Sequence, residues 1–480
     1  MKNIINKLKL KDIVIVGLVF FTLTSCQDYL SPAPISVLNS ATFFQNDSDL
    51  EGALVNMYDG LQGVNSTRTG DNHALQYEFY LTEMRSDNTR TKSSEGEAAQ
   101  FENYAIEATN GIVADYYTSF YNVIFRANTV LANLDVASDE NRARIEGEAK
   151  FVRAYAYFNL VRLYGEIPLV TSVISTEDTD VQYTRAATSE VYSLIESDLL
   201  VAVGSLDNAY KTRASKAAAQ ALLAKVYLTE GTNYLEAQTL CEDVMGSGFA
   251  LEPNFKDVFY NELNDEIIFA IGYEGDSQDS ENFSAEWLNG VGRTSGVNYT
   301  TEDVRNALDN LGGNRTPYSY RQDVGQPTQY QVVKYLPNGD ASLGIAPTST
   351  DPTKAGNDWI VLRYADVLLM HVEAIMAGGA STTSQAARDS FNAIRLRAGM
   401  PTIDAPDPIT KQELLDERRV ELAFEDQRLF DLIRFNEAQN VLSAFSTATG
   451  GSFTATDLLL PIPQREINLS KGVLKQNPGY

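Results

Sequence analysis

Apolar residues recur every three or four positions along much of the chain, the spacing that places side chains on one face of an α-helix. In the segment 116–134, Phe120, Ile124 and Ala127 follow this spacing. Polar residues fill the positions between them, so each such helix is expected to bury one side in a shared core. The same pattern predicts helices over 146–164, 189–206, 215–230, 234–245, 359–377, 383–397 and 410–435.

The predicted helices come in pairs of similar length. The helix over 146–164 is followed by Gly165 and then Pro168, which is typical of a helix C-terminus. The helix over 215–230 is rich in alanine, and small side chains allow neighbouring helices to approach closely. Such pairs resemble tetratricopeptide-type repeats, although their spacing is too irregular for a regular array. The predicted fold class is mostly α, with paired helices in a tetratricopeptide-like α-α superhelix.

One long segment lacks the helical period. Between Gly272 and Asn357 the residues are mainly Gly, Ser, Thr, Asn, Asp and Pro, with scattered aromatics. A long irregular segment within a globular chain is usually functional or disordered. We therefore expect a helical region at 46–270, a loop-rich ligand-binding insert at 271–358, and a C-terminal region at 359–480.

The N-terminal residues 1–25 have the features of an export signal, a lysine-bearing start followed by an apolar run over 13–21. This run is about half the length that a membrane-spanning helix needs, which argues against the alternative of a short membrane anchor. The ending Leu-Thr-Ser-Cys resembles a bacterial lipobox and implies that Cys26 is acylated. Residues 26–45, polar and interrupted by Pro, are then expected to form a tether. Cys241 has no partner left and is expected to be a buried small hydrophobe.

Composition excludes several classes of ligand and chemistry. The formal charge is −26, which repels phosphate backbones and anionic lipid heads, so nucleic acid is not an expected partner and a neutral ligand suits the protein better. With two His and no His-Glu-x-x-His or Cys-x-x-Cys motif, neither a metal site nor a cofactor is predicted. His371, in an apolar helix, is expected to be a packed histidine. The glycine-rich stretch 290–296 lacks the strand and acidic partner of a dinucleotide loop.

Several separated motifs occur in a consistent order along the chain. In the N-terminal half they cover residues 117–128 and 148–158; in the C-terminal third they cover 359–374, 391–399, 417–434, 460–463 and 476–480. Together these motifs resemble the SusD/RagB family over nearly the whole chain. Tyr117 is a departure, because relatives often carry Trp there. The insert matches nothing in the family pattern, so the ligand specificity stays open.

The resemblance implies a non-catalytic lipoprotein of the outer membrane that faces the cell exterior. Such a protein captures a glycan and delivers it to a SusC-like TonB-dependent transporter, while acylated Cys26 holds it to the membrane lipid. Two alternatives stay open, a binder of peptides or another nutrient for the same kind of transporter and, less favoured, a glycoside hydrolase. No Gly-x-Ser-x-Gly motif is present, and a glycosidase carboxylate pair is not identifiable from sequence.

The charged residues of the motif helix 417–434 allow a structural interpretation. Arg418 and Glu421, Glu425 and Arg428, and Asp431 and Arg434 lie three positions apart, which predicts ion pairs on the helix surface. Arg363, Asp366 and Glu373, in the preceding motif, are likewise expected to serve the fold.

Sugar binding requires flat aromatic side chains for the C–H face and amide, carboxylate or Arg groups for the hydroxyls. These groups are expected on exposed loops. The two segments that offer them are 71–90 and the insert; the alternative is that each aromatic there packs its own loop. The candidate ligand-binding residues are Tyr77, Asp87, Asn88 and Arg90 in the first segment and Trp287, Asn289, Tyr299, Tyr318 and Tyr320 in the second, with Trp287 the leading candidate.

Overall fold

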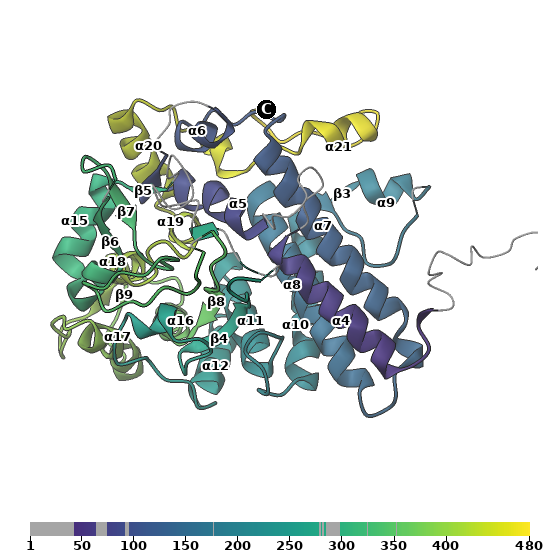
Figure 1. Ribbon diagram of the computed structural model, residues 1–480, viewed down its shortest axis with the longest axis horizontal. Helices are drawn as coiled ribbons and strands as arrows, with labels where there is room; N and C mark the ends of the chain where they lie inside the picture. Colours follow the sequence, from purple (N-terminus) through teal and green to yellow (C-terminus); the bar gives the residue numbers. More distant parts are fainter. Residues whose placement is uncertain are drawn as a thin grey trace, which may run out of the picture.

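The computed structural model shows a mostly helical protein (Figure 1). It describes residues 43–63, 74–91, 96–175, 177–277, 280, 283–284, 298–323, 325–351 and 353–480, with the backbone alone at 74–77. Within these residues, no helix is both long and apolar enough to cross a membrane. The predicted signal 1–25, the lipidated Cys26 and most of the tether lie outside this part of the chain.

Successive helices pack side by side and build the superhelix that the sequence predicts. Each member contacts the next, from α7 and α8 through α10, α11 and α12 to α16 and α17, and α4 covers α7. Their bounds are α4 (Asp47–Gln62), α7 (Gly111–Ala132), α8 (Arg142–Tyr164), α10 (Thr188–Ser205), α11 (Lys216–Glu230), α12 (Tyr234–Met245), α16 (Tyr364–Met376) and α17 (Gln385–Arg397). The predicted mostly-α fold class is confirmed.

The alanines of α11 explain how its neighbours approach so closely. Ala217, Ala218 and Ala221 have no exposed surface, and nearly the whole helix is buried between α10, α12 and α16. Ser215 caps its N-terminus by accepting a hydrogen bond from the backbone N–H of Ala218 (3.1 Å). At the other end Gly231 adopts a left-handed conformation (φ 67°) that closes the helix.

Two segments predicted as single helices are interrupted. Trp359–Arg363 forms strand β8, which pairs antiparallel with β4 (Ile267–Ile271), and helix α16 begins only at Tyr364. Apolar and β-branched side chains buried on both faces favour this strand pair. The expected helix 410–435 is broken into α18 (Lys411–Glu421) and α19 (Arg428–Arg434), and Phe424 and Asp426 between them have positive φ.

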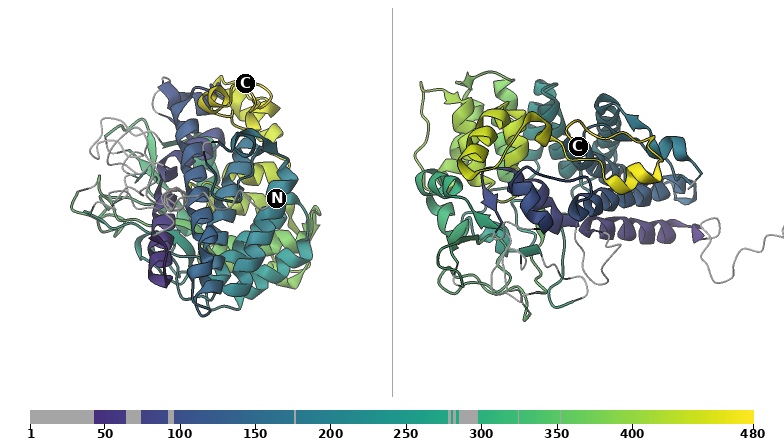
Figure 2. Two further views of the ribbon diagram at one scale, coloured as in Figure 1. Left: turned by 90° about the vertical axis from the view of Figure 1, so that its right-hand side faces the viewer. Right: turned by 90° about the horizontal axis from the view of Figure 1, so that it is seen from above.

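The described part of the insert is more ordered than the sequence suggested. It contains β5 (Tyr299–Thr300), α15 (Glu302–Leu311), β6 (Tyr320–Gln322) and β7 (Tyr330–Val332). With β1 (Thr89–Arg90) these strands form one antiparallel sheet in the order β1-β5-β7-β6. Helix α15 and strands β6 and β7 of the insert lie with α18 at the end of the molecule opposite α4, α7 and α10, as two views show (Figures 1 and 2).

The remaining elements are short and connect or cover the larger ones. They are α5 (Ala74–Leu81), η2 (Glu83–Arg85), α6 (Gly96–Glu102), η3 (Leu134–Val136), β2 (Ile167–Pro168), α9 (Thr179–Tyr183), β3 (Arg185–Ala186), α13 (Asp257–Tyr260), η4 (Gly313–Tyr318), β9 (Ser381–Thr382), β10 (Ile409–Thr410), α20 (Ala438–Thr449), η5 (Ala455–Leu458) and α21 (Gln464–Leu469).

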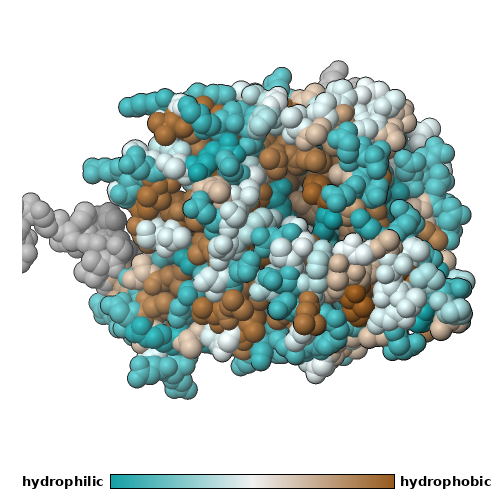
Figure 3. Space-filling view, turned by 180° about the vertical axis from the view of Figure 1, so that it is seen from behind, coloured by the Kyte–Doolittle hydropathy of each residue, from teal (hydrophilic) through white to brown (hydrophobic). Residues whose placement is uncertain are grey.

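A continuous apolar core joins the regions that the sequence analysis separated. It runs from Leu50 in α4 through Val332 in the insert to Leu474 near the C-terminus. A second cluster lies among α16, α17, α18 and α20 and includes Phe391 and Leu442. On the face seen in Figure 3, exposed hydrophobic residues form separate patches among hydrophilic ones, with a hollowed area toward the right.

Candidate functional site

Asp87 and Asn88 are buried, which contradicts the expectation that they lie exposed on a loop. Asp87 pairs with Arg428 (Nε–Oδ1 2.8 Å) and Arg419 (Nη2–Oδ2 2.9 Å). Burial alone would raise the pKa of Asp87, but the two guanidinium groups outweigh it and hold the pKa at about 2. Asn88 donates to Glu83 and accepts a hydrogen bond from Arg419. Neither side chain is on the surface to meet a ligand.

These two residues instead join β1 to the start of α15. The hydroxyl of Thr301 donates to the backbone oxygen of Asp87 (2.6 Å), and its backbone N–H donates to the oxygen of Asn88 (2.9 Å). The same hydroxyl accepts from the N–H of Val304 and so caps α15. One buried residue pair thereby fixes the relative position of β1 and α15.

A cavity of about 370 Å³ opens beside this junction. That volume lies within the range of small-molecule sites, roughly 300–1,000 Å³. Its walls come from β1, from β5 and α15, from the segment leading into β7, and from α20. The lining residues are Arg90, Glu102, Thr300, Thr301, Glu302, Asp303, Arg305, Thr328, Gln329, Tyr330, Phe445, Ala448 and Thr449. We refer to this space as the sheet-edge cavity.

Tyr330 places an aromatic ring on the wall of the sheet-edge cavity. The guanidinium of Arg305 lies over this ring, 4.3 Å from its centroid, which is a cation–π contact. Tyr320 meets Tyr330 edge to face, with 6.0 Å between ring centroids, and its hydroxyl donates to Asp309 (2.6 Å). Both tyrosines are half-buried, so each keeps some surface open to solvent.

Arg90 contributes an exposed, polar side chain to the wall of the same cavity. Its Nη2 donates to Oε1 of Gln329 (2.7 Å), a residue just before β7. Antiparallel pairing of Arg90 with Tyr299 sets its position, because Tyr299 in turn pairs with Gln331 of β7. Of the nine residues predicted for ligand binding, Arg90 lines the cavity and Tyr320 contacts its aromatic wall.

The other predicted residues have different surroundings. Tyr299 is fully buried and its hydroxyl donates to Asp323 (3.2 Å), so the expectation of an exposed aromatic is wrong at this position. Tyr318 is half-buried and packs against the core, away from the cavity lining. Trp287, Asn289 and the side chain of Tyr77 lie outside the described residues, so their assignment stays a prediction.

Sequence reasoning missed Tyr330, Arg305 and Gln329. Tyr330 begins the run Tyr-Gln-Val-Val-Lys-Tyr, and Gln329 directly precedes it; this run is rich in β-forming residues and indicates a strand after the turn at Pro327. Arg305 carries no signal of its own, because only the long-range pairing of β5 with β7 brings it over Tyr330.

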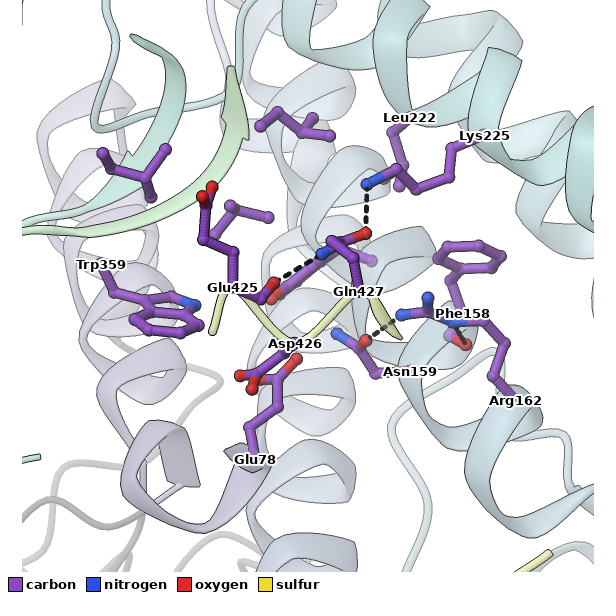
Figure 4. A pocket seen from close by; sticks show the side chains of 14 residues that line it. Glu78, Phe158, Asn159, Arg162, Leu222, Lys225, Trp359, Glu425, Asp426 and Gln427 are labelled. Carbon is purple, nitrogen blue, oxygen red and sulfur yellow. Dashed lines mark hydrogen bonds between the residues drawn. The ribbon is translucent and has the colours of Figure 1, made fainter. Parts of the chain in front are cut away.

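A second, much smaller cavity lies inside the molecule, between α5 and the turn before α19. Its volume is about 30 Å³, enough for one or two water molecules but not for a ligand. Glu78 and Asp426 point toward one another across it, from α5 and the turn (Figure 4). Burial raises the pKa of Glu78 to about 7. Burial, together with the negative charges of Glu78 and Glu83, raises the pKa of Asp426 well above its usual value.

The charged residues of the C-terminal motifs form a buried network rather than surface pairs. Arg418 pairs with Asp366 and Asp431, and Glu425 pairs with Lys334 and Arg363. The predicted surface pairs Arg418–Glu421 and Glu425–Arg428 are therefore wrong: the break between α18 and α19 turns Arg428 toward Asp87. Asp431 and Arg434 do pair (2.9 Å), but with little exposure.

Other buried polar residues form hydrogen bonds with one another. Glu373 accepts two hydrogen bonds from Arg434, and His371 is packed with Nδ1 2.8 Å from the hydroxyl of Ser390, as expected for a satisfied histidine. Cys241 is buried and free, also as expected. Among the described residues, no group of three or more His, Cys, Asp or Glu side chains is arranged to hold a metal ion.

Two models of known protein families match this chain, one in its C-terminal part and one in its N-terminal part. A model described as "SusD family" matches residues 291–480, and one described as "Starch-binding associating with outer membrane" matches residues 28–228. The chain belongs to the SusD/RagB family. Within this SusD/RagB protein, the two matches include both β1 and α15, the elements that frame the sheet-edge cavity.

Individual SusD/RagB relatives align along nearly the full length. SusD-like protein P2 of Formosa agariphila is 27% identical over an alignment that covers 99% of this chain and 100% of the relative. The solved structure of a laminarin-binding SusD-like protein has a TM-score of 0.74 at 26% identity, covering 91% of this chain and 100% of that one. Surface glycan-binding protein A of Bacteroides thetaiotaomicron, solved with laminarihexaose, has a TM-score of 0.74 at 21% identity, covering 90% and 99%, and shows the likeness of fold.

Proposed function

We propose that this protein binds an oligo- or polysaccharide in the sheet-edge cavity and leaves the glycan intact. The observation that carries the proposal is the combination of the half-buried ring of Tyr330 with hydrogen-bonding groups on the surrounding walls. A ring of this kind covers the C–H face of a sugar, while Arg90 and Gln329 offer N–H and C=O groups to its hydroxyls. Laminarin and laminarihexaose in the names of structural relatives support the same class of ligand.

We further propose the cellular setting that the family description supports, association with the outer membrane. Acylated Cys26 anchors the protein in this scheme, on the exterior face, and residues 26–45 tether the folded part. The glycan then passes to a SusC-like TonB-dependent transporter. In this scheme the protein binds the glycan without hydrolysing it.

Glycan affinity of the chain beginning after Cys26 tests the binding proposal. Isothermal titration against a panel of polysaccharides is expected to find one class that binds, and Tyr330→Ala should weaken its affinity at least tenfold, since aromatic contact supplies much of the binding energy. Tyr210→Ala is a matched control, because this tyrosine is half-exposed but contacts Arg213, on the helical side of the molecule. Trp287→Ala in the same series tests the leading sequence candidate.

Two assays separate the proposal from its alternatives. Reducing ends released from a bound glycan during prolonged incubation would show a hydrolase instead. Binding of peptides with no affinity for any polysaccharide would assign a different nutrient to the cavity. Equal affinity of Tyr330→Ala and the parent protein would remove the sheet-edge cavity as the binding site.

A further inference from the structure

Two arginines and three acidic residues line the sheet-edge cavity, so the arrangement of the arginines, and not the net charge, sets this site apart. The chain carries 64 acidic and 38 basic side chains, and the overall charge of −26 favours a neutral ligand. Within the cavity, however, Arg90 and Arg305 have no carboxylate within 4.0 Å among the described residues. Arg419, whose guanidinium reaches Asp87 just behind β1, shows the contrasting arrangement of a paired arginine.

Both cavity arginines contact only neutral groups in the described structure. Arg90 uses Nη2 to donate to the amide oxygen of Gln329 (2.7 Å). Arg305 uses Nη1 to donate to the backbone oxygen of Thr300 (2.7 Å) and to its hydroxyl (3.3 Å), while its planar face rests on Tyr330. A guanidinium carries five N–H donors, so each side chain has donors left for a ligand.

Three carboxylates line the same walls as these arginines. Glu102 lines the cavity, but its Oε2 accepts from the backbone N–H (2.8 Å) and the hydroxyl (3.1 Å) of Thr91. Glu302 and Asp303 are exposed in the first turn of α15, where negative charge complements the helix dipole. Because these acids outnumber the two arginines, an anion would be held by short-range contacts with the guanidinium groups and not by the long-range potential.

We propose that the ligand of the sheet-edge cavity is an anionic glycan, whose carboxylate or sulfate groups bind to Arg90 and Arg305. The inference rests on the proposed glycan-binding function and narrows its substrate class. The planar fork of a guanidinium matches two oxygens of a carboxylate or sulfate. Arg305 stands over Tyr330, so an anionic substituent and the sugar ring that bears it would contact adjacent groups of one wall.

Matched pairs of glycans isolate the effect of the anionic group. One pair is polygalacturonate and its fully methyl-esterified form; the other is a sulfated galactan and its desulfated form, with laminarin as a neutral reference. We expect one anionic member to bind at least tenfold more tightly than its neutralised partner, and the arm in which this occurs identifies carboxylate or sulfate. Raising NaCl from 0.05 to 0.5 M should change the affinity for the anionic glycan and leave any laminarin binding unchanged.

Substitutions then test the two arginines directly. Arg90→Gln and Arg305→Gln are each expected to reduce the affinity for the anionic glycan about tenfold or more, in line with charge-assisted hydrogen bonds. Arg305→Lys keeps the charge but not the planar fork and should recover only part of the affinity. Arg142→Gln, at an exposed position in α8, is the matched control, and thermal unfolding of each variant checks that it folds.

The outcomes distinguish this inference from the proposed function. If laminarin or another neutral glycan binds as tightly as the anionic ones and both glutamine variants retain full affinity, the anionic assignment is overturned while glycan binding stands. If no polysaccharide binds in either arm, both proposals fail together.

Discussion

Asp87 illustrates how much the surroundings of a single residue decide its role. In the sequence it lies in a polar segment and resembles a sugar-binding carboxylate. In the fold, Arg419 and Arg428, more than 330 positions later, form ion pairs with both of its carboxylate oxygens. No local sequence pattern predicts that pairing. His371 was predictable because it stands in an apolar helix, and Cys241 because it lies on the buried face of the amphipathic helix α12, with Ala237 and Val244.

The carboxyl groups beside the small internal cavity predict a pH-dependent stability. Glu78 and Glu83 have a folded pKa of about 7 against an ordinary value of 4.5, because both are buried; Arg162 and Lys225 near Glu78 and Lys334 near Glu83 offset this only in part. Because the folded state binds these protons more tightly than the unfolded state does, protonation increases the free energy of unfolding. This contribution is fully present below pH 4.5 and is lost as the pH rises through about 7. One such group is worth on the order of 3 kcal/mol.

Urea unfolding between pH 5 and pH 8.5 measures this effect. The free energy of unfolding should fall with rising pH, and Glu78→Gln should flatten the decline, because the amide needs no proton. Glu236→Gln, an exposed position in α12, should leave the profile unchanged. A parent profile that is already flat over this range contradicts the prediction.

At the scale of elements, the sequence predicted the long helices well and the strands poorly. The helix over 234–245 was placed to the residue, because a sustained period of three and four leaves few alternatives. The strands of the cavity sheet span only two or three residues each, too short for an alternating pattern to emerge. The apolar run 359–363 predicts the first turn of a helix but forms strand β8, because a short apolar run fits either element.

The contact between α8 and α10 depends on the glycine at position 147. A Cβ added there would overlap the hydroxyl of Ser205 and lie 3.1 Å from the side chain of Leu206, whereas one added at Gly204 would meet nothing within 4 Å. Gly147→Ala should therefore destabilise the protein by about 1–2 kcal/mol. Gly204→Ala should stabilise it by about 0.5–1 kcal/mol, since alanine favours the helix. Thermal unfolding of the two variants, with midpoints shifted in opposite directions, checks this; equal shifts would show that the helix contact is not tight.

At the scale of the whole molecule, one carboxylate links three regions. Glu421 of α18 pairs with Arg315 in the insert (2.8 Å), with Arg363 of β8 (2.7 Å) and with Arg397 of α17. The family motifs predicted that these charges serve the fold, but helix spacing suggested local partners. Their actual partners are set by tertiary packing, which one sequence does not reveal.

Removing that carboxylate charge should loosen all three connections at once. Glu421→Gln leaves buried arginines without full compensation, and we expect a loss of about 3–5 kcal/mol in the free energy of unfolding. Limited proteolysis should then cut the insert faster than in the parent protein, whereas Glu140→Gln, on an exposed turn, should change neither quantity. An unchanged unfolding midpoint would show that the network tolerates the loss of Glu421.

The sheet-edge cavity draws its walls from residue 90 at one extreme and residue 449 at the other. Contacts between such distant positions close large loops and tend to form late in folding. The cavity is thus complete only when both ends of the chain have been made and brought together. A bound glycan would contact both halves of the chain at once. Affinity for the glycan would therefore report whether the entire polypeptide has reached its folded state.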